Sequence, residues 1–291
     1  MQKHTSRMPA FIRLLRPKHW IKNLLVFIPA FFGGRLLLPG GMLAFVTMSL
    51  AASGVYAIND CHDAPQDRLH PDKCRRPVSS GAVSQPMALT IAALCFIAAF
   101  ALPPLLGMPL AASAVLALYV VMNLSYSVLG FKNIPIIDVT IVAMGFVLRI
   151  LYGAMMTDIA VSNWLLLTVL MGSYYMALGK RRNELRDVKA DTRAVLKAYT
   201  YAFLNQHMYL FLTLTIAFYS LWSVDATTVQ NAVLSIPLVV VLAMRYNLDV
   251  EGNHSGDPIE VISRDRVFIV LLALYGALMF ALLYLQGGGA A

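Results

Sequence analysis

The acidic side chains between residues 59 and 67 have the spacing that a metal site on a helix requires. Asp60, Asp63 and Asp67 stand at i, i+3 and i+7, so a helix places all three on one face. Their mutual repulsion must be neutralised by a cation or by bases. Mg²⁺ binds proteins through one or two carboxylates and leaves its other positions to water and substrate phosphates. The pattern predicts a Mg²⁺ site formed by Asp60, Asp63 and Asp67, with Asp60 and Asp63 taking part in catalysis.

A basic segment follows these acids directly, at Arg68, Lys73, Arg75 and Arg76. An acidic helix end followed by a basic loop favours a metal-bound diphosphate, and we expect Asn59, Lys73 and Arg76 to bind substrate. The alternative is a solvated charged loop between helices, against which the spacing and the preceding apolar run argue. Pro65 removes a backbone hydrogen bond and disfavours αR at Ala64. We therefore expect the helix to kink or stop near Asp63, so that Asp67 could point elsewhere.

A second candidate group begins at Gly179 with Lys180-Arg181-Arg182-Asn183-Glu184. Adjacent bases at a helix end suit phosphate groups, and Arg is the better bidentate partner. We predict Lys180 and Glu184 to be catalytic and Arg181 to bind substrate. The alternative is an ordinary basic anchor at the membrane surface. Glu184, Asp187 and Asp191 repeat the spacing of the first group, which predicts either a second metal face or helix-surface ion pairs.

Further candidates for substrate binding lie at the ends of apolar runs or inside them: Lys22, Asn23, Tyr126, Lys132 and Arg149. Tyr126 could equally be an interfacial aromatic residue. Arg149 lies inside an apolar run, where a charge costs about 2.5–3.5 kcal/mol on insertion scales. It should therefore face a partner or a wet cavity. Asp138 is a candidate partner, although the two are too far apart to pair along one helix.

The composition predicts an all-α, polytopic membrane protein. The 291 residues are 59% hydrophobic and only 13% charged, with a mean hydropathy of +0.68, whereas about a quarter of the residues are charged in soluble domains. Three cysteines without a C-x-x-C pair predict free thiols, and no cleaved signal peptide is expected. Nine apolar runs are long enough to span a bilayer: 20–38, 41–58, 87–105, 109–127, 135–157, 162–178, 205–223, 231–246 and 265–286.

The basic residues orient these nine predicted spans. All but two of the 23 Lys and Arg residues fall on one side, the exceptions being Arg35 and Arg149. Because such residues concentrate in cytoplasmic loops, we expect a cytoplasmic N-terminus and a multi-pass protein of the inner cell membrane. The net charge of +8 then reflects membrane topology, and no nucleic-acid partner is expected. A transporter would place polar groups nearer the bilayer midplane, so the one-sided polar loops favour an enzyme whose active site faces the cytoplasm.

The motifs resemble those of the UbiA intramembrane prenyltransferase superfamily. The resemblance lies in Asn59-Asp60-x-x-Asp63-x-x-x-Asp67 and in His70-Pro71-x-Lys73-x-x-Arg76-Pro77-x-x-Ser80-Gly81, and the order of spans and loops agrees over essentially the whole chain. It implies a single domain over residues 1–291, with nine transmembrane helices around a central cavity and loops 59–86 and 179–204 capping the active site. Most members carry a second aspartate-rich motif where this chain has Gly179 to Glu184.

The basic segment from Gly179 to Glu184, which replaces the second aspartate-rich motif, resembles that of one branch of the superfamily. Members of this branch transfer phosphoribose from phosphoribosyl pyrophosphate to decaprenyl phosphate. Arg16-Pro17-Lys18-x-Trp20-x-Lys22-Asn23, Leu129-x-x-Lys132-Asn133 and Asp138 support it. The resemblance implies that Mg²⁺ holds the pyrophosphate, that a polyprenyl phosphate attacks the anomeric carbon, and a role in cell-wall biosynthesis. The alternative is a prenyltransferase that moves an isoprenoid from its diphosphate to an aromatic or other acceptor. The oligomeric state stays open, a homo-oligomer included.

Overall fold

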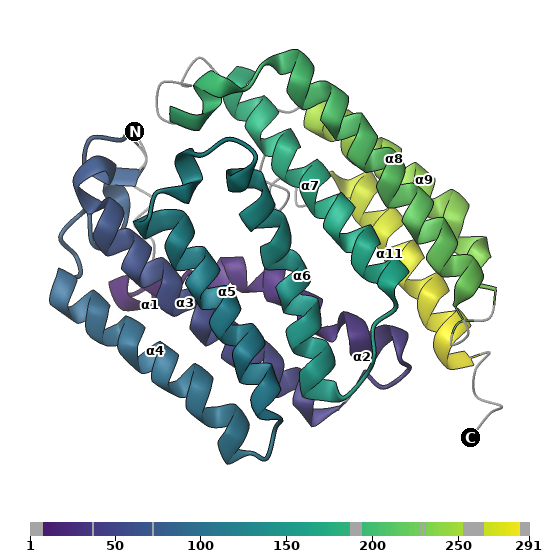
Figure 1. The fold of residues 1–291 in the computed structure, drawn as a ribbon, viewed down its shortest axis with the longest axis horizontal. Coiled ribbons are helices and arrows are strands. Elements are labelled where there is room, and N and C mark those ends of the chain that lie inside the picture. Colours follow the sequence, from purple (N-terminus) through teal and green to yellow (C-terminus); the bar gives the residue numbers. More distant parts are fainter. Residues whose placement is uncertain are drawn as a thin grey trace. The chain divides into compact units, whose positions relative to one another are not determined.

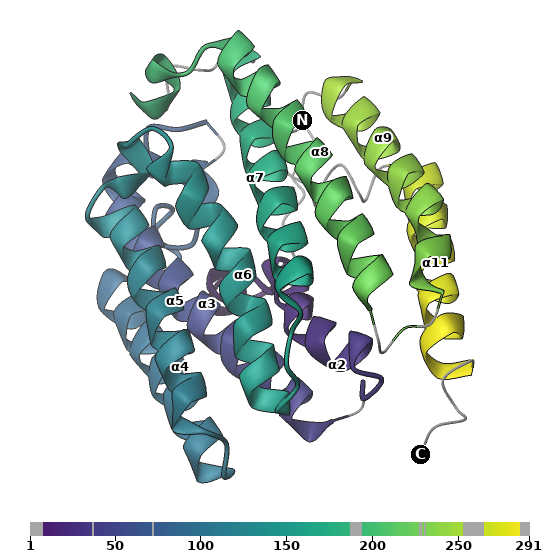
Figure 2. The ribbon, with the colours of Figure 1, turned by 45° about the vertical axis from the view of Figure 1, so that its right-hand side comes forward.

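The computed structural model describes residues 8–36, 38–71, 73–186, 194–226, 229, 231–252 and 265–285, and all the regular elements in these ranges are helices (Figures 1 and 2). No strand occurs in these ranges. The predicted all-α fold class is confirmed.

The chain divides into two compact units. Unit 1 comprises Met1–Ala30, Leu37–Phe131 and Leu148–Ile159, and unit 2 comprises Phe31–Leu36, Lys132–Val147 and Ala160–Ala291. Helix α6 (Ile137–Thr157) contributes its first part to unit 2 and its second part to unit 1. Unit 1 otherwise contains α1 (Ala10–Leu15), the 3₁₀ helix η1 (Pro17–Phe27), α3 (Pro39–Asp67), η2 (Lys73–Arg75), α4 (Gln85–Leu105) and α5 (Leu110–Val128). Unit 2 otherwise contains α7 (Asn163–Arg186), η5 (Ala194–Ala198), α8 (Tyr201–Asp225), η6 (Ala232–Ser235), α9 (Ile236–Gly252), α11 (Arg266–Phe280) and the π-helical turn η7 (Ala281–Leu285). Two short elements cross the boundary between the units: α2 (Ile28–Phe32) and η3 (Phe131–Asn133), of which Lys132 and Asn133 belong to unit 2.

In unit 1, α3 packs against α1, η1, α4 and α5. Small residues let these backbones approach closely, as is common in membrane helices. A Cβ atom on Gly153 of α6 would lie 2.0 Å from the carbonyl oxygen of Val26, and one on Gly54 of α3 would lie 2.8 Å from the ring of Phe96. Neither position has room for a side chain. The close approach at Gly153 brings η1 against the second part of α6.

In unit 2, α7 and α8 lie side by side, and α9 packs against both α8 and α11 (Figures 1 and 2). Their buried core includes Leu178, Leu204, Met208 and Val250. The last turns of α7 follow this core, so the basic residues that end α7 are anchored by apolar packing.

Seven helices in the described part are long and apolar enough to cross a membrane: α3, α4, α5, α6, α8, η6 with α9, and α11 with η7. The two remaining predicted spans differ from them in the structure. The first begins as η1 and continues as the short α2, so it is not one regular helix. The sixth is α7, which has the length but is less apolar because Asn163, Ser173 and two tyrosines interrupt its leucine-rich run. The chain is an integral membrane protein with seven candidate spans among its described residues.

Helix α3 continues through Pro65 to Asp67, so the stop expected near Asp63 does not occur. A proline leaves the carbonyl four residues earlier without its helical donor. Here that carbonyl belongs to Cys61, and the Gln85 side chain donates to it from 3.4 Å. Because a tertiary hydrogen bond replaces the missing helical one, the face that carries Asp60 and Asp67 stays continuous.

Candidate functional site

The carboxyl-terminal end of α3 holds two buried aspartates from the predicted metal-binding set. Asp60 is 0% exposed and Asp67 is 4% exposed. Arg76 contacts both, since its Nη1 lies 2.6 Å from Asp67 Oδ2 and 3.7 Å from Asp60 Oδ1. Arg16 forms a second ion pair with Asp60 Oδ1. The side chain of Asp63 is 21% exposed, and its carboxylate lies 3.2 Å from His62 Nδ1.

Two oxygen atoms beside these ion pairs have no hydrogen-bond partner in the described part of the chain. They are Asp60 Oδ2 and Asn59 Oδ1, and both are buried. Buried polar atoms of this kind are rare and costly unless a ligand or ion satisfies them. Their chemistry, a carboxylate and an amide oxygen, is that of ligands to a hard cation. Within the described residues, no group of three Asp, Glu, His or Cys side chains gathers as a complete metal cage, so any ion here would need water or substrate oxygens as well.

The loop after α3 folds back to place Arg76. The Arg76 carbonyl accepts from the Ser80 amide at 2.9 Å, and the Pro77 carbonyl accepts from the Val83 amide at 3.0 Å. Gly81 has a φ of 77°, which favours glycine. Val78 and Val83 are buried against α3 and α4. Lys73, the other predicted substrate-binding base of this loop, lies in η2 and is exposed.

Arg149 lies in a buried polar network of unit 1. It is 6% exposed, and its Nε donates to Asn23 Oδ1 at 2.8 Å while Nη2 donates to the Tyr119 hydroxyl at 2.9 Å. Asn23 in turn donates to Ser49 Oγ at 3.0 Å. The expectation that Arg149 must face polar partners is confirmed, and Asn23, predicted as a separate candidate, is one of them. Asp138 serves a different arginine, Arg181.

Arg181 is the centre of the polar cluster in unit 2. It is 3% exposed, and it donates from Nε to Asp138 Oδ2 at 2.6 Å and from Nη1 to Glu184 Oε2 at 2.6 Å. Asp138 is fully buried in the first turn of α6, where the helix dipole favours an anion. Arg181 and Glu184, predicted from one motif, do come together, with Asp138 as the third member.

Tyr199 completes this cluster by donating its hydroxyl hydrogen to Asp138 Oδ1 at 2.6 Å. The same hydroxyl oxygen accepts from the Ile136 amide at 2.6 Å. Ile136 has a φ of 69°, a strained value for a β-branched residue. Burial, together with the hydrogen bond to Asp138, raises the pKa of Tyr199 above its ordinary value. Tyr199 therefore stays a neutral donor at physiological pH and fixes the Asp138 carboxylate that orients Arg181.

The remaining predicted residues are distributed over both units. Lys22 in η1 and Tyr126 in α5 are half-buried residues of unit 1. Lys132 in η3 and Lys180 in α7 are half-buried residues of unit 2. Asp187 and Asp191, the candidates for a second metal face, lie outside the described residues.

Sequence reasoning missed two arginines as site residues. Arg16 pairs with Asp60, but sequence reasoning used it only as part of the motif Arg16-Pro17-Lys18-x-Trp20-x-Lys22-Asn23 and gave it no role in the site. Arg182 is 2% exposed, with Nη1 at 2.8 Å from Asn205 Oδ1 and 3.5 Å from Glu251 Oε1. It ties α7 to α8 and α9 beside the Arg181 cluster. The triple-base run could have pointed to it, because three adjacent helix positions cannot all face solvent.

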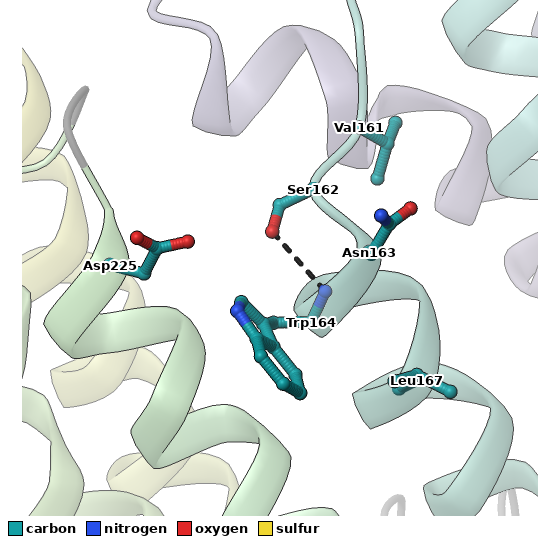
Figure 3. Close-up of a pocket in the computed structure, with 6 residues that line it drawn as sticks. All are labelled: Val161, Ser162, Asn163, Trp164, Leu167 and Asp225. Atoms are coloured by element: carbon teal, nitrogen blue, oxygen red, sulfur yellow. Dashed lines mark hydrogen bonds between the residues drawn. The ribbon is translucent and has the colours of Figure 1, made fainter.

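A pocket of about 490 Å³ in unit 2 contains none of these residues. Val161, Ser162, Asn163, Trp164 and Leu167 line it at the start of α7, and Asp225 lines it at the end of α8 (Figure 3). Ser162 Oγ accepts from the Trp164 amide at 3.3 Å, which caps α7. The sticks in Figure 3 show the Asp225 carboxylate on the opposite side of the pocket from Asn163 and Leu167. The predicted site residues lie on other parts of the chain.

The described part of the chain thus combines helices apolar enough to span a membrane with two buried clusters of charged side chains, at the ends of α3 and α7. The chain belongs to the UbiA prenyltransferase family, whose model matches residues 26–258.

Two similar relatives are named decaprenyl-phosphate phosphoribosyltransferase. The one from Mycolicibacterium smegmatis is 33% identical over 296 residues, covering 94% of this chain and 92% of its own. The one from Mycobacterium tuberculosis is 34% identical over 287 residues, covering 94% and 93%. A solved UbiA homolog from Archaeoglobus fulgidus, bound to GPP and Mg²⁺, matches with a TM-score of 0.74 at 18% identity over 94% of this chain and 99% of its own. The structural match shows the shared fold.

Proposed function

We propose that this chain transfers 5-phosphoribose from phosphoribosyl pyrophosphate to a polyprenyl phosphate, with decaprenyl phosphate as the best candidate, and releases diphosphate. Near-full-length similarity to two relatives of that name supports the assignment. The observation that carries it in the structure is the charged cluster at the end of α3, where Arg16 and Arg76 pair with the buried Asp60 and Asp67 and Asp60 Oδ2 has no hydrogen-bond partner among the described residues. Fixed guanidinium groups suit substrates that carry several phosphates.

The reaction joins a lipid phosphate oxygen to the anomeric carbon of ribose and breaks the bond from that carbon to the diphosphate. A lipid phosphate is already ionised at neutral pH, so the nucleophile needs no strong general base. Catalysis then consists mainly of positioning and of stabilising the negative charge on the leaving diphosphate. Arg16, Arg76 and Lys73 at the end of α3 are the bases that would bind the diphosphate. We assign Lys180, Arg181 and Lys132 to the remaining phosphate groups, and Asn23, Arg149, Lys22 and Tyr126 to orienting the acceptor.

The residues at the end of α3 fit Mg²⁺, because the partnerless oxygens of Asn59 and Asp60 offer two hard ligands. Asp60, Asp63 and Asp67 remain the proposed metal-binding set, with Asn59 beside them. When bound, the ion would neutralise charge on the diphosphate. The A. fulgidus homolog bound Mg²⁺ in its structure, which supports this choice of cation.

We further propose that nine segments cross the inner cell membrane, with η1–α2 and α7 added to the seven candidate spans. The N-terminus would then be cytoplasmic, and the polar loops 59–86 and 179–204 would face the cytoplasm and cap one active site. The one-sided distribution of Lys and Arg supports this orientation. Cysteine-accessibility labelling at Arg35 and at Arg68, each replaced by Cys, would place the two loops on opposite sides of the membrane.

A radiolabel transfer assay tests the function directly. Purified protein receives Mg²⁺, decaprenyl phosphate and ribose-labelled phosphoribosyl pyrophosphate, and the lipid is then extracted. We expect label in the lipid phase, and we expect EDTA or Asp60→Asn to abolish it, while Asp225→Asn, a matched loss of a carboxylate in the pocket at the α8 end, keeps wild-type transfer. Label that moves only from a prenyl diphosphate to an aromatic acceptor would instead establish the alternative prenyltransferase activity.

A further inference from the structure

The turn at Arg16 is held against α3 from both sides. The Leu15 carbonyl, just before Arg16, accepts from Ser53 Oγ at 2.8 Å. The Trp20 indole, just after it, donates to the same Ser53 Oγ at 3.1 Å. Ser53 and Asp60 are seven residues apart on α3 and so share a face of that helix. The backbone of Arg16 is thus fixed two helical turns from Asp60.

Arg16 itself has an unusual conformation. Its φ of 51° and ψ of 56° lie in the left-handed region, which non-glycine residues seldom adopt, and Pro17 follows it. Such conformations persist where the surroundings over-determine them, and they cluster at functional sites. The guanidinium lies 4.8 Å above the ring of Tyr56, one turn before Asp60, and pairs with Asp60 Oδ1. The local structure therefore aims a 20% exposed guanidinium at a fully buried carboxylate.

The two buried carboxylates at this helix end are balanced by two guanidinium groups. Asp60 and Asp67 carry two negative charges, and Arg16 and Arg76 carry two positive charges. A divalent cation that bound Asp60 alone would leave two positive charges in excess in a buried site. A cation that arrived with a diphosphate would not, because the diphosphate gives the displaced guanidinium a new anionic partner.

We infer that Arg16 is a positioning residue: its charge at Asp60 Oδ1 opposes a divalent cation that binds the partnerless Oδ2 of the same carboxylate, and so makes metal binding depend on the diphosphate. This inference rests on the proposed function for the identity of the diphosphate, although the contacts of Arg16 do not. Arg16 would exchange Asp60 for a diphosphate oxygen when metal and substrate enter together. Binding linkage is reciprocal, so metal and diphosphate should each raise the affinity for the other by the same factor.

Mn²⁺ binding tests the inference without turnover. Mn²⁺ is added to detergent-solubilised full-length protein, either alone or with inorganic pyrophosphate. The electron paramagnetic resonance signal of the free Mn²⁺ then measures how much has bound. For the wild type we expect pyrophosphate to tighten Mn²⁺ binding by about tenfold or more, within the usual range of coupling. Free Mn²⁺–pyrophosphate complex is corrected for with Asp60→Asn, which should bind neither form.

Arg16→Gln should tighten the binding of Mn²⁺ alone by about tenfold and lose most of the gain from pyrophosphate. Arg68→Gln removes the same charge from the exposed end of α3 and is the matched control, expected to behave as wild type. Arg16→Lys keeps the charge and guards against misfolding of the glutamine variant. Unchanged or weaker binding of Mn²⁺ alone in a folded Arg16→Gln protein would overturn the inference, as would Mn²⁺ binding that does not depend on Asp60. Because no ribose is transferred in this experiment, its failure and the failure of the proposed function are separate results.

Discussion

The carboxyl-terminal ends of α3 and α7 both bury charged side chains, but the sign of the charge differs. Helix α3 ends with Asp60, Asp63 and Asp67 and has no base in its last turn. Helix α7 ends with Lys180, Arg181, Arg182 and Arg186. A helix carries a partial negative charge at this end, so in its last turn a base such as Arg186 is stabilised and an acid such as Asp67 is destabilised, by about 0.3–1 kcal/mol.

This difference separates a structural arrangement from one that demands a ligand. In the last turn of α7, Arg186 agrees with the helix dipole, and Arg181 finds its anions within unit 2, at Asp138 and Glu184. Asp67 opposes the dipole at the end of α3, and Asp60 and Asp67 depend on Arg16 and Arg76. Within the described residues, the buried atom without a partner is a donor at the α7 end, Arg182 Nε, and an acceptor at the α3 end, Asp60 Oδ2, so the α3 end is the stronger signal for a cation.

The largest effect is expected from Asp60→Asn, which keeps the shape of the side chain and removes its charge. Transfer of ribose label to lipid should fall about 10³-fold, comparable with the loss of one strong electrostatic contact at a reacting centre. Asp63→Asn, at the more exposed position, should lose less. Equal losses in the two variants would show that burial does not rank these carboxylates.

Arg181→Met should act on stability as well as on activity. It leaves Asp138 buried without its cation, which costs about 3–5 kcal/mol. Thermal unfolding in detergent, followed by tryptophan fluorescence, measures this loss. Adding Asp138→Asn should restore much of the stability but none of the activity. Full recovery of activity in the double variant would mean that Arg181 serves structure alone.

Mg²⁺ should raise the unfolding temperature of the protein by binding to the carboxylates at the end of α3 and not to Glu184 of α7. A ligand at one hundred times its dissociation constant contributes about 2.7 kcal/mol. The shift, measured with pyrophosphate present, should disappear in Asp60→Asn and persist in Glu184→Gln. Loss of the shift in Glu184→Gln would instead support a second metal face on α7.

The smallest effect is expected from Gln85→Ala. It removes the donor to the Cys61 carbonyl, which Pro65 has deprived of its helical partner. A partly exposed hydrogen bond contributes about 0.5–1.5 kcal/mol, and we expect the lower end of that range. Hydrogen exchange should rise at the amides of the last α3 turn, whereas Gln66→Ala, at an exposed position nearby, should leave the exchange unchanged.

The parts of the site that could be predicted from sequence depend on local periodicity. The spacing of Asp60 and Asp67 places them on one helix face whatever packs against it, and they do share Arg76. The insertion cost of Arg149 likewise predicts a polar partner without naming it. The apolar runs predict the seven candidate membrane spans in their order, but not the irregular structure of the first segment.

The parts that could not be predicted depend on residues far apart in the chain. Pro65 argues for a helix break, and only the presence of Gln85 beside Cys61 reverses that argument. Arg16 belongs to a basic motif near the N-terminus, but its contact with Asp60 depends on a left-handed turn that Ser53 of α3 holds in place. Asp138 is a candidate partner of Arg149 from the sequence, but in the structure it forms an ion pair with Arg181 of α7.

The bond between Arg149 and Asn23 has a consequence for the order of biosynthesis. The two residues are 126 positions apart, and a ribosome that adds about 5–20 residues per second needs roughly 6–25 seconds to cover that distance. Throughout this interval Asn23 is already part of the nascent chain while Arg149 has yet to be made. Ser49, only 26 positions after Asn23, becomes available several times sooner and can occupy the amide in the meantime. The Asn23 amide of η1 can thus form its bond to Ser49 before α6 is synthesised and supplies Arg149.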